Sequence, residues 1–491
     1  MLAPRMKRPL PIGPPSSSFP ARATRLCAAL GFAALVACDG APTPPRFDGA
    51  VSDGNTALDG GPSFDGGAAP DGGEATDGGA PVDGGTPVDG GTRLDGGGAP
   101  DAGAQGGVVL VLPACTRDGC VRDYTPRGDY SRATIRAAVE SGVRVDIGYS
   151  VYTVRFWTSG RESTGTVVFP YDPSIAELGP LHVIGNLHGT TGVGDACALS
   201  GFVLGAGLAG TFGARGFVGV AVDYPGLGTE GTHPYLVSRV EGACALDGLR
   251  AARQLAGLLG KRLSGRYALA GLSQGGHAAL SAAAMHTDYA PDLMLRAVAA
   301  VAPAAVQQAQ WSAAVALAGP HIAYHALLVY AWARYYAHST ADGGAPIWTE
   351  PIASRIDALL EAHCIGTLDG TPLTRVIPQD PTELFHSDFL SAYQSGRFAP
   401  YPFLTTGFTE NALRPYRQSA PLRIYQGDAD GVVAEPYTRA LVHALRDGGV
   451  TVDYQVVPDG THTDIAFGYL AFLQRRTEEA LGWLQAMLDA P

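Results

Sequence analysis

Hydrophobic side chains are distributed unevenly along the 491 residues of the chain. After an apolar run at 26–37, large apolar residues almost disappear until about residue 108. From there they return in short, strand-length runs that alternate with helix-length segments. This pattern predicts a folded region at 108–491, preceded by a long segment that buries too little apolar surface to fold.

Strand-length runs dominate the first part of the folded region. Alternating and aromatic residues predict antiparallel strands at 145–158 and 164–170. Buried strands are predicted at 181–192, 217–228, 266–272 and 295–305, with a helix at 239–259. Strands and helices that alternate at this spacing are typical of a mostly parallel sheet with helices on both faces, so the predicted fold class is α/β.

Between about 306 and 420 the alternation stops. The segment 311–338 is almost wholly apolar and aromatic, and a membrane span is one interpretation. Gly319 and Pro320 at its centre, with three histidines and Arg334, favour two shorter helices. We therefore predict a helical cap over the sheet. Strands at 421–433 and 450–464 and a helix from about Ile465 to Leu488 are predicted after it.

Residues 1–38 have the features of a secretion signal. A basic start precedes the apolar run at 26–37, which is too short for a stable membrane span. The four residues Leu35 to Cys38 resemble the lipobox of bacterial lipoproteins, whose cysteine is acylated and becomes the new N-terminus. We expect Cys38 to anchor the protein to a membrane of the bacterial cell envelope; an ordinary secreted protein is the alternative.

Residues 39–107 repeat DGG and PVDGG, which predicts a disordered tether. A calcium-binding repeat is the alternative, but that repeat needs a recurring large apolar residue, which is missing here. Between Asp48 and Asp101 the segment has eleven acidic residues and one arginine, so it accounts for most of the net charge of −12. The folded region has no basic stripe, which argues against a nucleic-acid partner.

The segment Tyr267–Ala279, YALAGLSQGGHAA, joins a short apolar run to a GxSxG pentad and a helix-forming stretch. Gly271 and Gly275 flank Ser273 at a spacing that lets a strand, a tight turn and a helix pack closely. This arrangement predicts a nucleophile elbow, which lifts the serine hydroxyl out of the sheet. The amide of Gln274 would then face the point where the oxyanion of a substrate forms.

Three candidate catalytic residues stand in the order Ser273, Asp430 and His462, each after a predicted strand. In parallel sheets, functional groups gather at the carboxyl ends of strands. The histidine would take the serine proton, and the acid would hold the imidazole in the required tautomer. Asp428 competes with Asp430 for the last role. We favour Asp430, which stands three residues after a strand-ending glycine and precedes the apolar Val433.

Further site residues are expected around this constellation. His188, at the end of a predicted strand, is expected to be structural, whereas the backbone amide of Thr190 is the second candidate oxyanion donor. The cap aromatics offer more apolar surface than their helices need to pack, so some should bind substrate; the candidates are Trp311, Tyr324 and Trp332. His321 and His325 stand four residues apart, but no third ligand is near, so we expect no metal and no cofactor.

The cysteines leave several pairings open. Cys115 and Cys120 flank a turn that could close a small disulfide loop outside the cytoplasm. With Cys38 lipidated, these two and Cys197, Cys244 and Cys364 remain, so at least one has no partner within the chain.

The motifs together resemble the secretory lipase branch of the α/β-hydrolases from about Val145 to the C-terminus. They are HGTTG (188–192), DYPGLG (223–228), GLSQGG (271–276), GDADGVV (427–433) and GTHTD (460–464), with the long cap. The resemblance implies an α/β-hydrolase fold with a helical cap before the acid-bearing strand. It also implies a carboxylic ester hydrolase, with acylglycerols or simpler esters as substrates.

Three functions are compatible with these observations. The first is a serine esterase or lipase displayed on a bacterial envelope, and the second is a serine peptidase or acyltransferase on the same fold; the triad does not separate them. The third is a non-catalytic surface binding protein. An intact set of nucleophile, acid and base argues against it. Nothing in the sequence indicates the oligomeric state.

Overall fold

The computed structural model describes residues 109–112, 115–139, 143–175, 177–200, 203–338, 344–366, 370–462 and 477–491. The predicted signal peptide with Cys38 and the predicted tether lie outside these residues. Lipidation, cleavage and disorder of the N-terminal segment therefore stay predictions.

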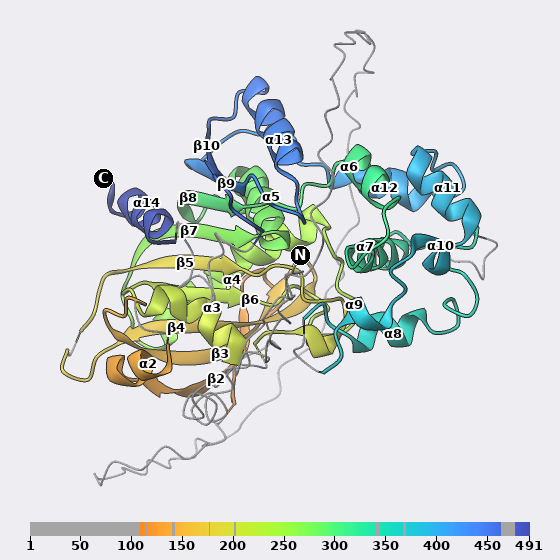
Figure 1. Cartoon of the computed structure of the whole chain (residues 1–491). Helices are drawn as coiled ribbons and strands as arrows, with labels where there is room; N and C mark the ends of the chain where they lie inside the picture. Colours follow the sequence, from red (N-terminus) through yellow and green to blue (C-terminus); the bar gives the residue numbers. More distant parts are fainter. Residues whose placement is uncertain are drawn as a thin grey trace, which may run out of the picture. The chain divides into compact units, whose positions relative to one another are not determined.

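One mixed sheet of ten strands runs through the described part of the chain, in the order β1-β2-β3-β4-β6-β5-β7-β8-β9-β10 (Figure 1). The strands from β1 to β4, and the pair β4 and β6, are antiparallel, whereas every pair from β6 to β10 is parallel. The strands are β1 (Leu110–Val111), β2 (Val121–Tyr130), β3 (Gly148–Thr158), β4 (Arg161–Tyr171), β5 (Leu181–Leu187), β6 (Val218–Val222), β7 (Leu263–Leu272), β8 (Met294–Val301), β9 (Leu422–Gly427) and β10 (Val452–Val457). The predicted α/β class, with an antiparallel start and a parallel main part, is confirmed.

Strand β2 is one of the elements that the hydrophobic pattern does not predict. It contains Pro126 and Gly128, which weaken a strand pattern and are typical of edges and bulges. The pairing of β2 with β3 shifts register between these two residues, and only the two-residue β1 separates β2 from the edge of the sheet. Pairing with β3 therefore decides the conformation of a segment whose own sequence favours a turn.

The inner parallel strands, β5 to β8, bury residues on both of their faces. Val183 and Leu269 belong to a core that includes residues of α4 and α5, whereas the adjacent Ile184 and Ala268 belong to a core with residues of α3 and α14. Successive side chains of a strand point to opposite faces, so these strands are apolar at nearly every position. The helices outside the cap are α2 (Arg132–Ala138), α3 (Val203–Gly213), α4 (Ser238–Leu258), α5 (Gln274–Tyr289), α13 (Glu435–Asp447) and α14 (Thr477–Asp489), with a short 3₁₀ turn η1 (Asp195–Cys197). Of the predicted final helix, only the part in α14 falls within the described residues.

A helical insertion separates β8 from β9 (Figure 1). Its helices are α6 (Gln308–Ala314), α7 (Ile322–Tyr335), α8 (Ile356–Ala362), α9 (Leu373–Val376), α10 (Pro381–Leu384), α11 (Ser387–Ser395) and α12 (Pro402–Glu410). They have a hydrophobic core of their own, in which Trp332 and Tyr393 are fully buried. The apolar segment 311–338 divides into α6 and α7 around Gly319, which has φ 147, and Pro320, as predicted. No helix among the described residues is long and apolar enough to span a bilayer.

Two disulfides link described cysteines. Cys115 pairs with Cys120, which closes the short loop suggested by the sequence, and Cys197 pairs with Cys364. The second bond joins the segment after β5 to the cap, across 167 positions of the chain. Cys244 is buried without a disulfide, and burial raises the pKa of its thiol, which makes it unreactive.

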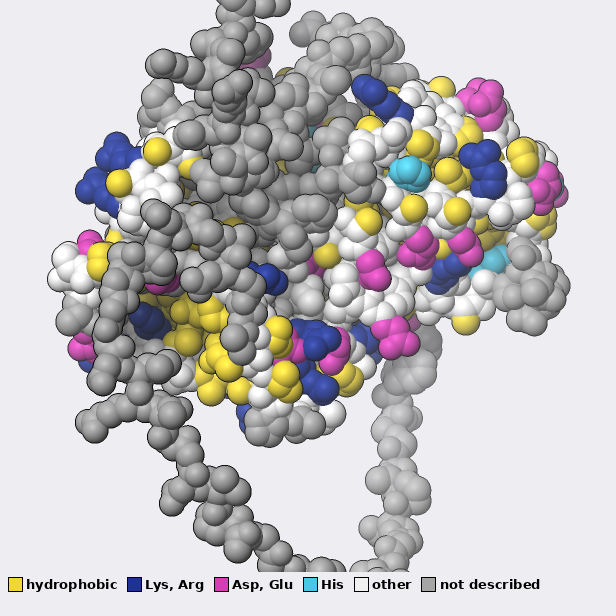
Figure 2. Space-filling view, turned by 90° about the horizontal axis from the view of Figure 1, so that it is seen from below, with side chains coloured by type: hydrophobic (Ala, Val, Ile, Leu, Met, Phe, Trp, Pro, Cys, Tyr) yellow, Lys and Arg dark blue, Asp and Glu magenta, His cyan; other side chains and the backbone are white. Residues whose placement is uncertain are grey.

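Charged side chains are mixed on the visible surface. On the face in Figure 2, Lys and Arg side chains are scattered among acidic and hydrophobic ones. Several arginines are paired with acids; Arg250, for example, contacts Asp247 and Asp292. The positive charge of Arg250 is therefore balanced by adjacent acids.

Candidate active site

The elbow at Ser273 has the backbone geometry that its sequence predicts. β7 ends at Leu272, Ser273 has φ 58 and ψ −114, and α5 begins at Gln274. A positive φ is strained for a residue with a side chain, and such strain is typical of functional turns. The surrounding fold therefore holds Ser273 in one unusual conformation.

Two glycines make this turn possible. A Cβ atom on Gly271 would collide with the backbone of Gly275, and a Cβ atom on Gly275 would collide with the carbonyl of Leu187 on β5. The backbones of β5, β7 and α5 approach each other this closely only because both positions lack a side chain.

Hydrogen bonds at the backbone of Ser273 fix its position. Its amide donates to the carbonyl of Val301 at 2.9 Å, and its carbonyl accepts from the amides of His277 and Ala304 at 3.0 Å each. The hydroxyl does not cap α5, and the residue is 8 % exposed. The side chain is thus nearly buried, and among the described residues its hydroxyl does not serve as a helix cap.

Asp430 and His462 are hydrogen-bonded to each other. His462 Nδ1 lies 2.8 Å from Oδ2 of Asp430, whose side chain is fully buried. The other carboxylate oxygen of Asp430 accepts from the amides of Val432 and Val433 at 2.8 Å, and Gln426 Nε2 donates to Oδ2 at 3.0 Å. These donors fix the orientation of the carboxylate toward the imidazole.

Asp428 has a different environment. It is exposed, and its Oδ1 accepts from the backbone amide of Asp459 at 2.6 Å. It therefore holds the turn that precedes His462, whereas Asp430 holds the ring of His462.

Neighbouring strands bring the acid and the histidine together. β9 and β10 pair in parallel with Gly427 opposite Val457, so the loops that carry Asp430 and His462 begin at the same level. The amide of Ala429 donates to the carbonyl of Gly460 at 3.1 Å, which holds the two loops against each other. Residues 463–476, directly after His462, lie outside the described residues.

The two candidate oxyanion donors flank the serine. A Cβ atom placed on Gly189 would lie only 3.8 Å from Cβ of Ser273, so the loop that carries Thr190 passes beside this serine. Gln274 is the first residue of α5, and the amides of a first helical turn have no acceptor within the helix. β5 and β7 pair in parallel with Leu187 opposite Gly271. The loop after β5, with Thr190, and the elbow after β7 therefore begin at the same level, at the carboxyl ends of the strands.

A buried polar cluster behind the elbow was not predicted from the sequence. Glu241 of α4 has no exposed surface, and it accepts hydrogen bonds from the amide of Leu236 at 2.8 Å, Gln274 Nε2 at 2.7 Å and His277 Nδ1 at 2.7 Å. His233 is also fully buried, and its Nε2 lies 2.7 Å from Gln274 Nε2. The available sequence signal was an acid directly before the apolar and small residues at 242–246 of α4.

The electrostatics of this cluster favour a charged Glu241. Burial raises the pKa of a carboxyl group, but hydrogen bonding and attraction from His233 and His277 outweigh burial and lower the pKa of Glu241 to about 2. The carboxylate of Glu241 is therefore ionised at neutral pH, although the residue has no surface exposed to water.

The three candidate substrate residues of the cap differ in their surroundings. Tyr324 is half-buried, and its pKa is raised by burial and by the negative charge of Asp430, so its hydroxyl lies within electrostatic range of that carboxylate. Trp311 is 9 % exposed, and its Nε1 donates to the carbonyl of Ala305 at 3.3 Å. Trp332 is fully buried, so its prediction as a substrate contact is corrected: its ring fills the cap core, against Gly407 and Phe408.

The other singled-out histidines have structural contacts. His188 is buried, and its Nδ1 donates to the carbonyl of Gly189 at 2.7 Å. His321 Nε2 donates to the carbonyl of Ala314 at 3.1 Å, while His325 Nδ1 lies 3.1 Å from the hydroxyl of Tyr393. Burial and the neighbouring His321 lower the pKa of His325 to about 3, so this ring is neutral. No cluster of metal-ligating side chains occurs among the described residues.

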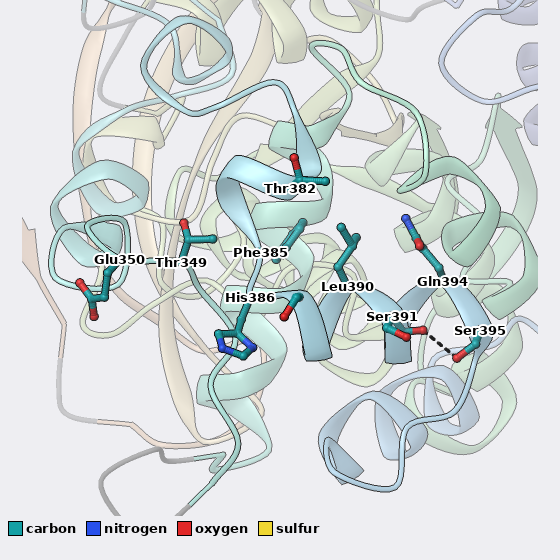
Figure 3. Close-up of a pocket in the computed structure, with 10 residues that line it drawn as sticks. Thr349, Glu350, Thr382, Phe385, His386, Leu390, Ser391, Gln394 and Ser395 are labelled. Atoms are coloured by element: carbon teal, nitrogen blue, oxygen red, sulfur yellow. Dashed lines mark hydrogen bonds between the residues drawn. The ribbon is translucent and has the colours of Figure 1, made fainter.

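A separate pocket of about 780 Å³ opens in the cap, around α10 and α11 (Figure 3). Two threonines that line it use their hydroxyls within the cap: Thr349 Oγ1 donates to the carbonyl of Glu383 at 2.6 Å, and Thr382 Oγ1 donates to Asp380 Oδ1 at 2.7 Å. Its lining contains none of the predicted catalytic residues. This hollow is therefore a feature of the cap, separate from the candidate active site.

The antiparallel start, the parallel main sheet, the elbow between β7 and α5 and the helical insertion after β8 define the α/β-hydrolase fold. Two known structures illustrate the likeness. The rice cell wall degrading esterase LipA from Xanthomonas oryzae is 21 % identical, with a TM-score of 0.61 over 76 % of this chain and 98 % of that chain. Candida antarctica lipase A in its closed state is 15 % identical, with a TM-score of 0.56 over 76 % of this chain and 83 % of that chain.

The sequence also matches a family. Residues 209–314, which include β7, the elbow and β8, match the Secretory lipase family, so the predicted resemblance to secretory lipases is confirmed over this segment. No curated protein sequence matches the chain. The family match and the fold together support a hydrolase of the esterase and lipase class.

Proposed function

We propose that this protein is a serine carboxylic ester hydrolase, an esterase or lipase that works through an acyl-enzyme. The observation that carries the proposal is the 2.8 Å hydrogen bond from His462 Nδ1 to the buried Asp430. This pair follows the carboxyl ends of β9 and β10, and the strained elbow with Ser273 follows the carboxyl end of β7. A base oriented by a buried acid, with a nucleophile in an elbow, is the arrangement that acyl transfer requires.

The hydrogen bond to Asp430 assigns the roles of the two imidazole nitrogens. Nδ1 of His462 donates to the carboxylate, which leaves Nε2 as the base that takes the proton of Ser273. The serine oxygen then attacks the ester carbonyl, and the amides of Thr190 and Gln274 donate to the oxyanion. The alcohol leaves with the proton from His462. Water attacks the acyl-enzyme with His462 as base, which releases the acid and restores the serine.

The proposed substrates are small-molecule or lipid esters, with the acyl group held between the elbow and the cap. Tyr324, beside the Asp430 loop, and Trp311, which bonds to the segment just after β8, are the proposed contacts for the acyl group. Attachment to the bacterial envelope through a lipid on Cys38 belongs to the same proposal, and it rests on the lipobox sequence alone.

The test compares hydrolysis of p-nitrophenyl esters with hydrolysis of an aminoacyl p-nitroanilide. The wild type should hydrolyse the esters. Ser273→Ala and His462→Ala should each lower kcat by about a million-fold, and the double variant by little more, because the residues act as one unit. Ser281→Ala is the matched control: this serine is also on α5 and buried, and its hydroxyl has no hydrogen-bond partner among the described residues. It should retain full activity.

Two results would contradict the proposal. Ester hydrolysis that survives in Ser273→Ala would exclude a serine acyl-enzyme. A much higher kcat/KM for the anilide than for the esters would make the protein a peptidase.

A further inference from the structure

We propose that Tyr235 and Glu241 are positioning residues that set the two oxyanion amides, Tyr235 through Thr190 and Glu241 through Gln274. Both lie in one segment, 233–241, which enters α4 beneath the elbow. The inference rests on the proposed ester hydrolysis, and it adds to it the residues that determine the geometry of the oxyanion hole. Neither Tyr235 nor Glu241 touches the reacting atoms in this account.

Tyr235 supports the first amide. Its hydroxyl lies 2.9 Å from Oγ1 of Thr190, and the residue is 2 % exposed. No other hydrogen bond of the Thr190 side chain occurs among the described residues. The contact is made by a rigid aromatic side chain, so it fixes the distance from the loop that carries Thr190 to the segment 233–241.

The cap holds Tyr235 in place from the other side. Trp332 Nε1 donates to the carbonyl of Tyr235 at 3.0 Å, and the amide of Tyr235 donates to the carbonyl of His233 at 2.8 Å. The bond from Trp332 gives the N–H of this fully buried indole a hydrogen-bond partner. It connects the cap core to the residue that supports Thr190.

Glu241 supports the second amide. One carboxylate oxygen accepts from both the Leu236 amide and Gln274 Nε2, and the other accepts from His277 Nδ1. Gln274 and His277 form the first turn of α5, so two side chains of that turn are tied to one buried charge on α4. An ionised group makes stronger hydrogen bonds than a neutral one, which makes the carboxylate a stiff anchor for the amide of Gln274.

Positioning of this kind should act on the rate of acyl transfer more than on substrate binding. Oxyanion donors stabilise charge that develops only in the transition state, and an error of about 1 Å in the active site lowers rates by about a hundredfold. A loosened amide therefore lowers kcat while KM changes little. A loss of stability alone would lower the melting temperature without this pattern.

The experiment is a double-mutant cycle with Thr190→Val and Tyr235→Phe. Each change removes one hydroxyl but keeps the shape of the side chain and, for Thr190, the backbone amide. We measure kcat and KM on a p-nitrophenyl ester, and the rate at which an alkyl p-nitrophenyl phosphonate labels Ser273. In that labelling step the serine oxygen bonds to phosphorus, p-nitrophenolate leaves, and the serine proton passes to His462.

Each single variant should lower kcat and the labelling rate by about tenfold to a hundredfold. KM should stay within about threefold, and the double variant should be no worse than the singles, because both break one contact. Tyr401→Phe is the matched control, since Tyr401 is a buried tyrosine of the cap whose hydroxyl donates to the carbonyl of Pro346 at 3.0 Å. It should lose similar stability and keep kcat.

Glu241→Gln extends the test to the second amide, with Asp247→Asn as a control on another fully buried acid of α4. Glu241→Gln should lower kcat and the labelling rate, whereas Asp247→Asn should change only stability. If Glu241→Gln fails to fold, the cycle at Thr190 and Tyr235 still decides the proposal. Tyr235→Phe with wild-type kcat, or a double variant whose losses multiply, would overturn it. Failure of the phosphonate to label wild-type Ser273 would instead refute the proposed function itself.

Discussion

Nδ1 of His462 lies 2.8 Å from the buried carboxylate of Asp430, whereas Asp428, two residues earlier, is exposed and bonds to the amide of Asp459. The two acids of one loop therefore have separate tasks. One orients the imidazole, and the other stabilises the turn that leads to it.

This division predicts different effects for two similar substitutions. Asp430→Asn should lower kcat by about ten-thousand-fold, because the histidine remains but no longer adopts the required tautomer. Asp428→Asn should lower kcat by about tenfold or less, since an amide oxygen still accepts from Asp459. Steady-state kinetics on one soluble ester compares the two variants directly. A larger loss in Asp428→Asn would reverse the assignment of the acid.

The two buried acids of α4 predict opposite pH effects on stability. The pKa of Glu241 is lowered from 4.5 to about 2, so its stabilisation is complete above pH 4.5 and is lost as the pH falls toward 2. The melting temperature of Glu241→Gln should therefore approach that of the wild type as the pH falls from 5 to about 2.5.

Asp247 provides the control of opposite sign. Burial raises its pKa from 3.8 to about 6, so its contribution is most favourable below pH 3.8 and is lost as the pH rises through 6. Asp247→Asn should thus gain stability relative to the wild type as the pH rises from 4 to 7. Thermal unfolding at a series of pH values measures both variants. Parallel curves for the two would contradict the assigned charge states.

The cap aromatics predict a contrast between substrate selectivity and stability. If Tyr324 contacts the acyl chain, each added methylene of the ester should raise kcat/KM a few-fold until the pocket is full, since a buried methylene contributes about 0.8 kcal/mol. Tyr324→Ala should flatten this profile. Trp332→Ala should instead lower the free energy of unfolding by about 3 to 5 kcal/mol, because it leaves a cavity in the cap core. A profile that falls from acetate upward would exclude an acyl pocket.

The disulfide between Cys197 and Cys364 should contribute more to stability than the one between Cys115 and Cys120. The first disulfide joins cysteines with a sequence separation of 167, and the second joins cysteines with a separation of 5. A crosslink that closes a longer loop removes more conformational entropy from the unfolded chain, so it stabilises the folded state more. Replacing Cys197 and Cys364 with alanine should lower the free energy of unfolding by about 5 kcal/mol, and replacing Cys115 and Cys120 by about 2 kcal/mol. Denaturant unfolding measures both. Equal losses would show that loop length does not determine the effect.

The lipobox predicts acylation of Cys38. Metabolic labelling with a fatty acid should mark the wild type and should not mark Cys38→Ser, because the thiol is the site of attachment. Cys27, inside the predicted signal, is the matched control, and Cys27→Ser should remain labelled. Label that persists in Cys38→Ser would contradict the lipoprotein prediction.

Local sequence was sufficient for the features that depend on neighbouring residues. The apolar runs of β5 to β8 follow from burial on both faces, and the break between α6 and α7 follows from Gly319 and Pro320. The elbow at Ser273 is also local, because its strain and its flanking glycines lie within one short motif. These elements could be predicted from the order of residues along the chain.

Contacts between distant segments decided the rest. The choice between Asp430 and Asp428 depends on a loop 32 residues away in sequence, which carries His462. Glu241 gains its side-chain donors from Gln274 and His277 only after α4 packs against α5. Trp332 has an aromatic surface suited to substrate, yet the folding of α12 against α7 covers it completely. A sequence pattern specifies which side chains can be buried, but their partners are chosen by the three-dimensional packing of segments that the pattern treats separately.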